Sequence, residues 1–432
     1  MHTTRRDLLR SSLIAAAAAP ALRAWPGSGA DSGAGSAPQT STPGQAHSQR
    51  AVITPNGVTL PHRMVDGVRV LHLVAEEVEH EFAPGLAARC WGYNGRVHGP
   101  TIECVEGETV RIYVTNRLPV STTVHWHGLI VPSGMDGVGG LHQRPIEPGE
   151  TFKYEFTLRQ HGTYMYHSHH DEMTQMALGL MGLFVIHPRE PEPNPPARDY
   201  AILLSEWKLE PGTRRPDPNE MMDFNVLTMN AKIHPATQNL VAQRGERVRI
   251  RLANLSAMSH HPIHLHGHSF RVTATDGGPL PESNGWKEVS ILVPVGSTRT
   301  IEFIADQPGD WPLHCHMTHH VMNQMGHGLP NTVGADLGRI DETLYAHVPA
   351  YGDMEDEMGA GGDHSSLAPP NSLPMIGGKG PYGTITMSGM FTILKVRESI
   401  AEGVEPGWYE APPETIARRA TKEELERDGI SG

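Results

Sequence analysis

An internal duplication constrains the fold of this 432-residue chain more than any other feature of its sequence. Four short segments of the first half return in the same order in the second half. Chance can supply one such match but hardly four in one order, so we interpret the chain as two copies of one domain. The matched segments are 107–116 with 245–254, 125–128 with 264–267, 148–156 with 294–303, and 162–169 with 309–316.

Each copy carries the residue pattern of a β domain. Apolar and polar residues alternate at 110–114 and 152–158 in the first copy, and at 248–252 and 301–303 in the second. A period of two is typical of strands with one buried face. Helical periodicity is scarce before 414–428, where a short polar helix is predicted. The sequence therefore predicts an all-β fold of two tandem β-sandwiches.

Shifts in composition divide the chain further. Residues 4–10 carry a twin-arginine pattern, and the apolar run 13–22 that follows is too short to span a bilayer. We therefore expect export through the twin-arginine pathway to the periplasm or the exterior, with an uncleaved anchor as the alternative. The predicted segments are a signal peptide (1–24), a disordered leader (25–50), domain one (51–187), a stiff Pro-rich linker (188–197), domain two (198–400) with a Met-, Gly- and acid-rich insertion at about 326–384, and a tail (401–432).

Composition excludes some classes of binding partner and indicates that the protein binds a metal. The net charge of −13 argues against nucleic acid or an anionic membrane as a partner. The chain has 27 histidines and 19 methionines, whose imidazole and thioether groups suit copper. Its three cysteines cannot form a disulfide scaffold. Cys90 and Cys104 are predicted either to pair in an oxidising compartment or to remain buried thiols.

Pairs of the form His-x-His occur four times, twice in each copy. Residues two apart on a strand project from the same face, so each pair can aim two imidazoles at one place. One pair alone is more often a surface feature, but four at equivalent positions of a duplicated domain predict a metal centre. Eight imidazoles suit a cluster of three copper ions. The pairs are His125 and His127, His167 and His169, His264 and His266, and His314 and His316.

The second copy adds a different set of candidate ligands. His261, Cys315, His320 and Met325 supply two imidazoles, one thiolate and a weak thioether, which is the ligand set of a blue, electron-transfer copper. The first copy lacks this set, so one mononuclear site is predicted. The corresponding positions there are Thr122, Ser168, Met173 and Leu178.

Together these motifs resemble those of the multicopper oxidases, specifically the two-domain, small-laccase-like members. The matching segments are 125–128, 167–169, 261–267 and 314–325. Too few residues lie between the second and third segments for the middle domain of a three-domain laccase. The resemblance implies cupredoxin-like Greek-key domains. It also implies a copper-dependent oxidase that couples one-electron oxidation of a reductant to four-electron reduction of O₂ to water.

The resemblance further implies a role for each candidate ligand. Cys315 would receive electrons and pass them on, because His314 and His316 flank it in the chain. Four coppers per functional unit are implied. Their ligands are His261, Cys315, His320 and Met325 for type 1, His125 and His264 for type 2, and His127, His167, His169, His266, His314 and His316 for type 3.

Several residues near the motifs carry weaker predictions. Asp136 stands where the family keeps a carboxylate near the cluster and is a candidate proton relay, with a turn aspartate before glycine as the alternative. Val131 replaces a tyrosine of small laccases, and Val321 replaces an acid of copper-efflux oxidases. Four more histidines adjoin the motifs out of ligand register and are predicted to orient ligands or to lie at the surface: His170, His260, His268 and His319.

The resemblance implies a head-to-tail homotrimer in which domain one of one subunit and domain two of the next share a cluster, with a monomer as the alternative. Phenols, Cu(I) and Mn(II) remain open as reductants. The insertion is either solvated or a lid that offers thioether and carboxylate groups to metal ions. Two other functions are weighed: copper sequestration without turnover, and nitrite reduction, which would need the mononuclear cysteine in the first domain.

Overall fold

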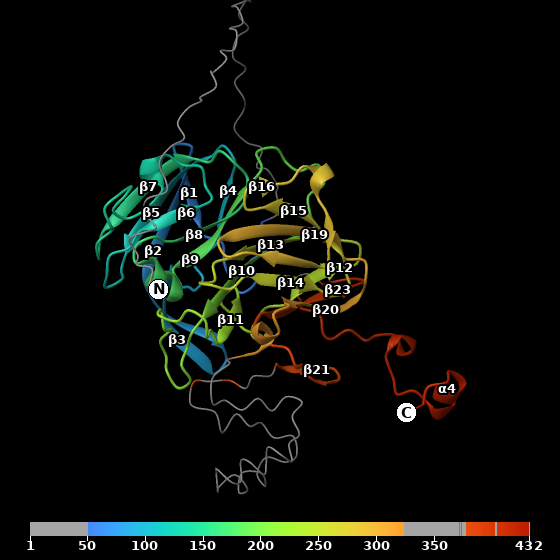
Figure 1. The fold of residues 1–432 in the computed structure, drawn as a ribbon. Coiled ribbons are helices and arrows are strands. Elements are labelled where there is room, and N and C mark those ends of the chain that lie inside the picture. The colour runs from blue at the N-terminus through green and yellow to red at the C-terminus, as the bar shows by residue number, and fades with distance from the viewer. Residues whose placement is uncertain (1–50, 324–370, 372, 374–376, 402–403, 432) are drawn as a thin grey trace, which may run out of the picture. The chain divides into compact units, whose positions relative to one another are not determined.

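Strands dominate the part of the chain that the structure describes, as the alternation of apolar and polar residues predicts. The computed structural model describes residues 51–323, 371, 373, 377–401 and 404–431, which belong to one compact unit (Figure 1). The predicted all-β fold is confirmed, since these residues form two β-sandwiches. The signal peptide, the leader, Met325 and most of the predicted insertion lie outside the described residues.

The first sandwich contains strands β1 to β9. One of its sheets is formed by β1 (His62–Val65), β2 (Val68–Ala83), β5 (Thr109–Asn116) and β7 (Thr151–Thr157), with β3 (Leu86–Tyr93) paired to β2. The opposing sheet is formed by β4 (Ile102–Val105), β9 (Met181–His187), β8 (Gly162–Ser168) and β6 (Val124–His127).

The second sandwich follows the linker. Its larger sheet is formed by β11 (Val226–Met229), β10 (Arg198–Trp207), β13 (Arg247–Asn254), β19 (Ser297–Ile304), β15 (Phe270–Thr275) and β16 (Gly278–Pro279), with β17 (Lys287–Glu288) on β15. The other sheet is formed by β12 (Leu240–Gln243), β23 (Phe391–Arg397), β20 (Gly309–Cys315), β14 (His261–Leu265) and β18 (Ser290–Val293). A separate hairpin pairs β21 (Lys379–Gly380) with β22 (Gly383–Thr384).

The four repeated segments become equivalent strands in the two sandwiches. β5 pairs antiparallel with β7 in the first sandwich, as β13 does with β19 in the second. In the same way, β6 pairs with β8 and β14 pairs with β20. The duplication therefore extends from the sequence to the pairing of the strands.

The strands that carry the histidine pairs have one face in an apolar core. Trp126 lies between His125 and His127, is fully buried, and packs its ring 5.2 Å from that of Tyr154. Leu265, the last residue of β14, is likewise buried between His264 and His266. Burying side chains of this size contributes about 1.5–3 kcal/mol each. Because neighbouring residues of a strand project to opposite faces, core packing at these positions turns the histidines to the other face.

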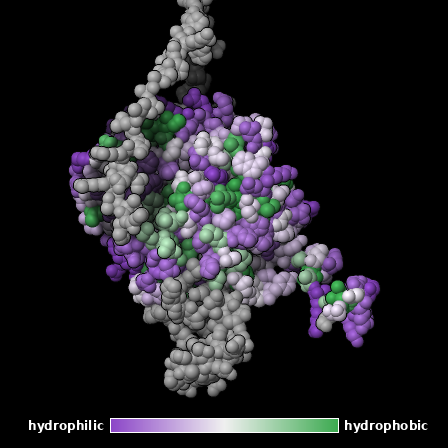
Figure 2. Space-filling model, viewed as in Figure 1, coloured by the Kyte–Doolittle hydropathy of each residue, from purple (hydrophilic) through white to green (hydrophobic). Residues whose placement is uncertain are grey.

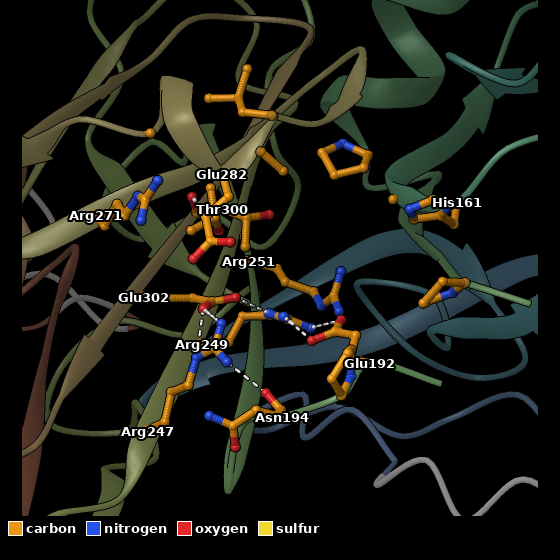
Figure 3. Close-up of a pocket in the computed structure, with 18 of the residues that line it drawn as sticks. His161, Glu192, Asn194, Arg247, Arg249, Arg251, Arg271, Glu282, Thr300 and Glu302 are labelled. Carbon is orange, nitrogen blue, oxygen red and sulfur yellow. Dashed lines mark hydrogen bonds and ion pairs between the residues drawn. The ribbon is translucent and has the colours of Figure 1, made fainter. Parts of the chain in front are cut away.

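Charged residues fill the contact between the linker and the outer face of β13. Arg249 binds Glu192 of the linker at 2.8 and 2.7 Å and Glu302 at 2.6 Å (Figure 3). Arg251 binds Asp199 through two contacts of 2.8 Å and reaches Thr163 of the first sandwich at 3.0 Å. Burial alone would raise the pKa of Asp199, but the arginines lower it. A cavity of about 890 Å³ opens beside this network, and its lining contains none of the predicted copper ligands.

Helices among the described residues are short. α1 (Glu172–Ala177) follows β8 and was not expected from the sequence. The polar helix predicted at 414–428 is shorter, forming as α4 (Lys422–Arg427) after a 3₁₀ turn at Pro413–Thr415. A capping box between Thr421 and Glu424 sets where α4 begins. None of the described helices is both long and apolar enough to cross a bilayer.

Candidate metal centre

The predicted mononuclear ligands that the structure describes lie together inside the second sandwich. The Sγ atom of Cys315 is 3.7 Å from Nδ1 of His261 and 3.5 Å from Nδ1 of His320, and the two Nδ1 atoms are 3.2 Å apart. Pairing of β14 with β20 brings Cys315 beside Ile263, and the 3₁₀ turn η3 (Thr318–Val321) carries His320. These donor atoms converge on a point that one metal ion can occupy.

Electrostatics in this group favour a bound cation. Burial raises the pKa of the Cys315 thiol to about 12 and lowers those of His261 and His320 to about 3 and about 4. Without a metal the thiol and both imidazoles are therefore neutral at pH 7. The second nitrogen of His261, Nε2, is 2.7 Å from Ser256 Oγ, which leaves Nδ1 facing the thiol. A thiolate and two imidazoles fit copper.

Four histidines of the first sandwich form a second group. Register between β6 and β8 places His125 opposite His167. Nδ1 of His127 lies 3.3 Å from Nε2 of His167, while the other nitrogens of these two rings donate to Gly296 O at 2.9 Å and Ser168 O at 2.8 Å. In this assignment both facing nitrogens carry lone pairs and no proton. A cation between them satisfies both.

The remaining nitrogens of the first group are oriented in the same way. Nδ1 of His125 donates to Asp136 O at 2.8 Å, so its Nε2 is free. The ring of His169 lies 5.4 Å from that of His125 and 6.0 Å from that of His167. The donor atoms of His125, His127 and His167 therefore converge on one place, with the ring of His169 beside them.

The second sandwich repeats this arrangement on the outer face of β14 and β20. His264 lies opposite His314, and Nε2 of His266 is 3.1 Å from Nε2 of His314. Nδ1 of His264 donates to Val289 O at 2.6 Å and Nδ1 of His314 to Cys315 O at 2.8 Å. The ring of His316 is 5.6 Å from each of these two rings.

The structure brings the eight paired histidines into two groups of four. Among the described residues, which include all eight, no ring contact or hydrogen bond joins a histidine of one group to a histidine of the other. One histidine of the first group contacts the second sandwich, because His127 donates to the backbone oxygen of Gly296. Each group is thus half of the eight-imidazole set.

Carboxylates lie beside the first histidine group. Oδ2 of Asp136 is 3.4 Å from Nδ1 of His125 and 3.2 Å from Nδ1 of His142. Glu172 approaches two further histidines of the group, at 3.6 and 3.7 Å. Sequence reasoning identified Asp136 but missed His142 and Glu172, although their closeness in the chain to the motifs was a signal.

The first sandwich fills the place of the mononuclear group with neutral side chains. Oε1 of Gln175 accepts hydrogen bonds from Thr122 Oγ1 at 2.7 Å and from Ser168 Oγ at 2.5 Å. All three side chains are buried, as is Leu178, whereas Met173 is exposed. This hydrogen-bonded triad has no thiolate or imidazole to hold copper.

The four histidines that adjoin the motifs, and the two remaining cysteines, lie in different surroundings. His268 is buried against Trp311 and directs Nδ1 to the backbone oxygen of His266 at 3.2 Å. His260 accepts from Val295 N at 3.0 Å. His170 is half-buried and His319 is exposed. Cys90 and Cys104 are buried free thiols on strands of different sheets, so the disulfide alternative is wrong.

Comparison with known proteins agrees with this fold and these donor groups. Two family models described as multicopper oxidase match residues 74–191 and 210–334. The blue copper oxidase structure from Nitrosomonas europaea superposes with a TM-score of 0.57 at 26% identity, over 76% of this chain and 86% of that one. The multicopper oxidase mgLAC superposes with a TM-score of 0.57 at 26% identity, over 78% and 88%.

Sequence relatives include copper resistance protein A of Escherichia coli, 32% identical over 43% of this chain and 38% of the relative. Laccase-19 of Oryza sativa subsp. japonica is 32% identical over 52% and 40%. The chain spans about two fifths of the length of these relatives. Its fold and donor groups are those of a cupredoxin copper protein. The chain belongs to the multicopper oxidase family.

Proposed function

We propose that this protein is a copper-dependent oxidase that couples one-electron oxidation of a reducing substrate to the four-electron reduction of O₂ to water. The observation that carries the proposal is the position of Cys315 on β20. Its side chain points into the mononuclear group, while His314 on the same strand belongs to the outer histidine group. A covalent path through a single peptide bond therefore joins the two candidate metal centres.

The ligand roles follow the family pattern. His261, Cys315, His320 and Met325 would hold type 1 copper, and His125 and His264 would hold type 2 copper. When bound, copper supplies the one-electron acceptor at the first group and the site of O₂ reduction at the histidine groups. The type 3 ligands would be His127, His167, His169, His266, His314 and His316.

Oxygen reduction consumes protons, and the chain offers a carboxylate for this purpose. Asp136 Oδ2 lies between the rings of His125 and His142. Its backbone oxygen accepts the N–H of His125, which keeps the carboxylate beside this ligand. We assign Asp136 as a proton relay to the cluster.

Assembly as a head-to-tail homotrimer would complete the cluster. Each chain presents half of the eight imidazoles in each sandwich. Exposed apolar residues adjoin both halves, with Leu141 74% exposed near the first, and Val289 and Leu292 each 50% exposed beside the second. The face drawn in Figure 2 is mainly hydrophilic, with apolar side chains in small separate groups. Contact between domain one and domain two of successive copies would cover the apolar residues at the histidine groups.

Export through the twin-arginine pathway to the periplasm or the exterior is part of the proposal, because of the motif at residues 4–10. The reductant is a small molecule or metal ion, and phenols, Cu(I) and Mn(II) are the candidates to compare. Copper sequestration without turnover is the second candidate function, favoured by the similarity to copper resistance protein A.

Oxygen uptake by fully copper-loaded protein tests the proposal. We expect O₂ consumption with at least one of a phenol, Cu(I) and Mn(II), with four donor molecules oxidised per O₂ and no hydrogen peroxide accumulating. A fully loaded protein that consumes no O₂ with any of these donors would instead support sequestration.

A further inference from the structure

A buried carboxylate holds the loop that leads into the mononuclear group. Glu206, near the end of β10, is 5% exposed. Its Oε1 accepts hydrogen bonds from the backbone N–H groups of Met258 at 2.6 Å and Ser259 at 2.9 Å. Its Oε2 is buried and has no hydrogen-bond partner among the residues that the structure describes. One oxygen of this side chain is thus satisfied and the other is not.

No cationic side chain of the described chain compensates Glu206. Its near neighbour Lys208 is committed to Glu210 at 3.2 Å and Asp223 at 3.1 Å. A buried charge without a partner costs several kcal/mol, so such groups are normally paired or beside a metal. The position of Glu206 therefore calls for a positive charge nearby.

The segment that Glu206 holds leads into the mononuclear group. Ser259 is two residues before His261, and Ser256 of the same loop bonds to the ring of His261. Burial raises the pKa of the Cys315 thiol, and the Glu206 carboxylate raises it further. Glu206 is therefore anchored to the loop that positions His261, one of the candidate type 1 ligands.

We propose that Glu206 is the counter-charge of the oxidised type 1 copper and lowers its reduction potential. This inference rests on the proposed function. Cu(II) with one thiolate carries a net charge of +1, and Cu(I) with the same thiolate carries none. A nearby negative charge consequently stabilises the oxidised form over the reduced form that one electron produces. Sequence analysis gave no signal for this residue, because it lies outside all the copper motifs.

The test is a redox titration of the type 1 copper in holoenzyme carrying Glu206→Gln. Glutamine keeps an oxygen that can accept from Met258 and Ser259 but removes the charge. We expect the blue absorption to persist and the potential to rise. Glu210→Gln is the matched control. It also removes one carboxylate, but the side chain of Glu210 is 59% exposed, so solvent screens its charge and the potential should stay unchanged.

Each outcome decides the proposal. A blue Glu206→Gln enzyme with the wild-type potential would overturn it. If Glu206→Gln fails to take up type 1 copper, Glu206→Asp is measured instead. A blue Glu206→Asp enzyme with a potential near that of the wild type would support a requirement for the negative charge. Loss of type 1 copper in Glu206→Asp as well would overturn the proposal, because the side chain would then be needed to anchor the loop. Absence of blue absorption in the wild-type holoenzyme would contradict the type 1 assignment itself, which separates failure of the proposed function from failure of this inference.

Discussion

At the scale of single residues, the histidines are aimed by hydrogen bonds to backbone oxygens. His125, His127 and His167 each donate one ring N–H to a carbonyl oxygen and leave the other nitrogen facing its neighbours. Such a hydrogen bond sets which nitrogen is free to bind metal. The carbonyl acceptors are thus part of the candidate site, although no sequence motif identifies them.

Replacing the mononuclear thiolate tests the type 1 assignment. Cys315→Ser should abolish the intense blue absorption and reduce turnover to background, because no other described thiol lies in that group. Copper should still bind to the histidine groups, as measured by metal analysis. Cys104→Ser, at a buried thiol in the core of the first sandwich, is the control and should remain blue. Blue absorption in Cys315→Ser would remove this cysteine from the site.

The neutral triad of the first sandwich carries a stability prediction. Gln175→Leu leaves the buried hydroxyls of Thr122 and Ser168 without their shared acceptor. We expect the free energy of unfolding to fall by about 1–3 kcal/mol in urea titrations of the apoprotein. Thr174→Ala, at the preceding half-buried residue of α1, removes only a hydrogen bond to the exposed Asp171 and should change it by less than about 0.5 kcal/mol. Equal stability of Gln175→Leu and the wild type would show that the triad contributes nothing.

At the scale of strands, the alternation of side chains between the two faces explains how one strand contributes residues to two candidate metal centres. Cys315 projects inward and His314 outward along β20, and Trp126 projects inward between two outward histidines of β6. This arrangement could be predicted from the His-x-His spacing, because a period of two follows directly from strand geometry. The short helix α1 could not, since its six residues are too few to show a helical period.

The charged outer face of β13 gives a pH prediction. The pKa of Asp199 is lower in the folded protein, so its ionised form stabilises the fold above its unfolded pKa of about 3.9. That stabilisation is lost as pH falls through the lower folded value. Asp199→Asn, which leaves Arg251 without its charge partner, should lose roughly 3–5 kcal/mol at pH 7, and the difference from the wild type should shrink below pH 4.

Urea titrations at pH 7 and at acid pH measure this effect. Asp276→Asn is the control, because Asp276 pairs with Arg299 at a position where its side chain is 55% exposed. Such a pair contributes at most about 1 kcal/mol. A difference for Asp199→Asn that stays constant across the pH range would contradict the role of its charge.

At the scale of the whole molecule, the sequence predicted two sandwiches and the candidate ligands that the structure brings together, but not the long-range polar contacts. The duplicated segments identify equivalent strands because repeats are visible in one chain. Contacts such as Arg251 with Thr163, or Glu206 with the loop before His261, join residues whose partners no local pattern reveals. Polar contacts between residues far apart in the chain become visible only in the folded structure.

The proposed oxygen-reducing centre combines two histidine groups from different subunits. Chains carrying His127→Ala and chains carrying His316→Ala should each be inactive alone, since each damages one half of every cluster. After subunit exchange, verified by native mass spectrometry, some interfaces of a mixed trimer pair an intact first half with an intact second half. The account predicts partial return of O₂ consumption in the mixture. If exchange is verified and no activity returns, the cluster is not shared between subunits and the account is contradicted.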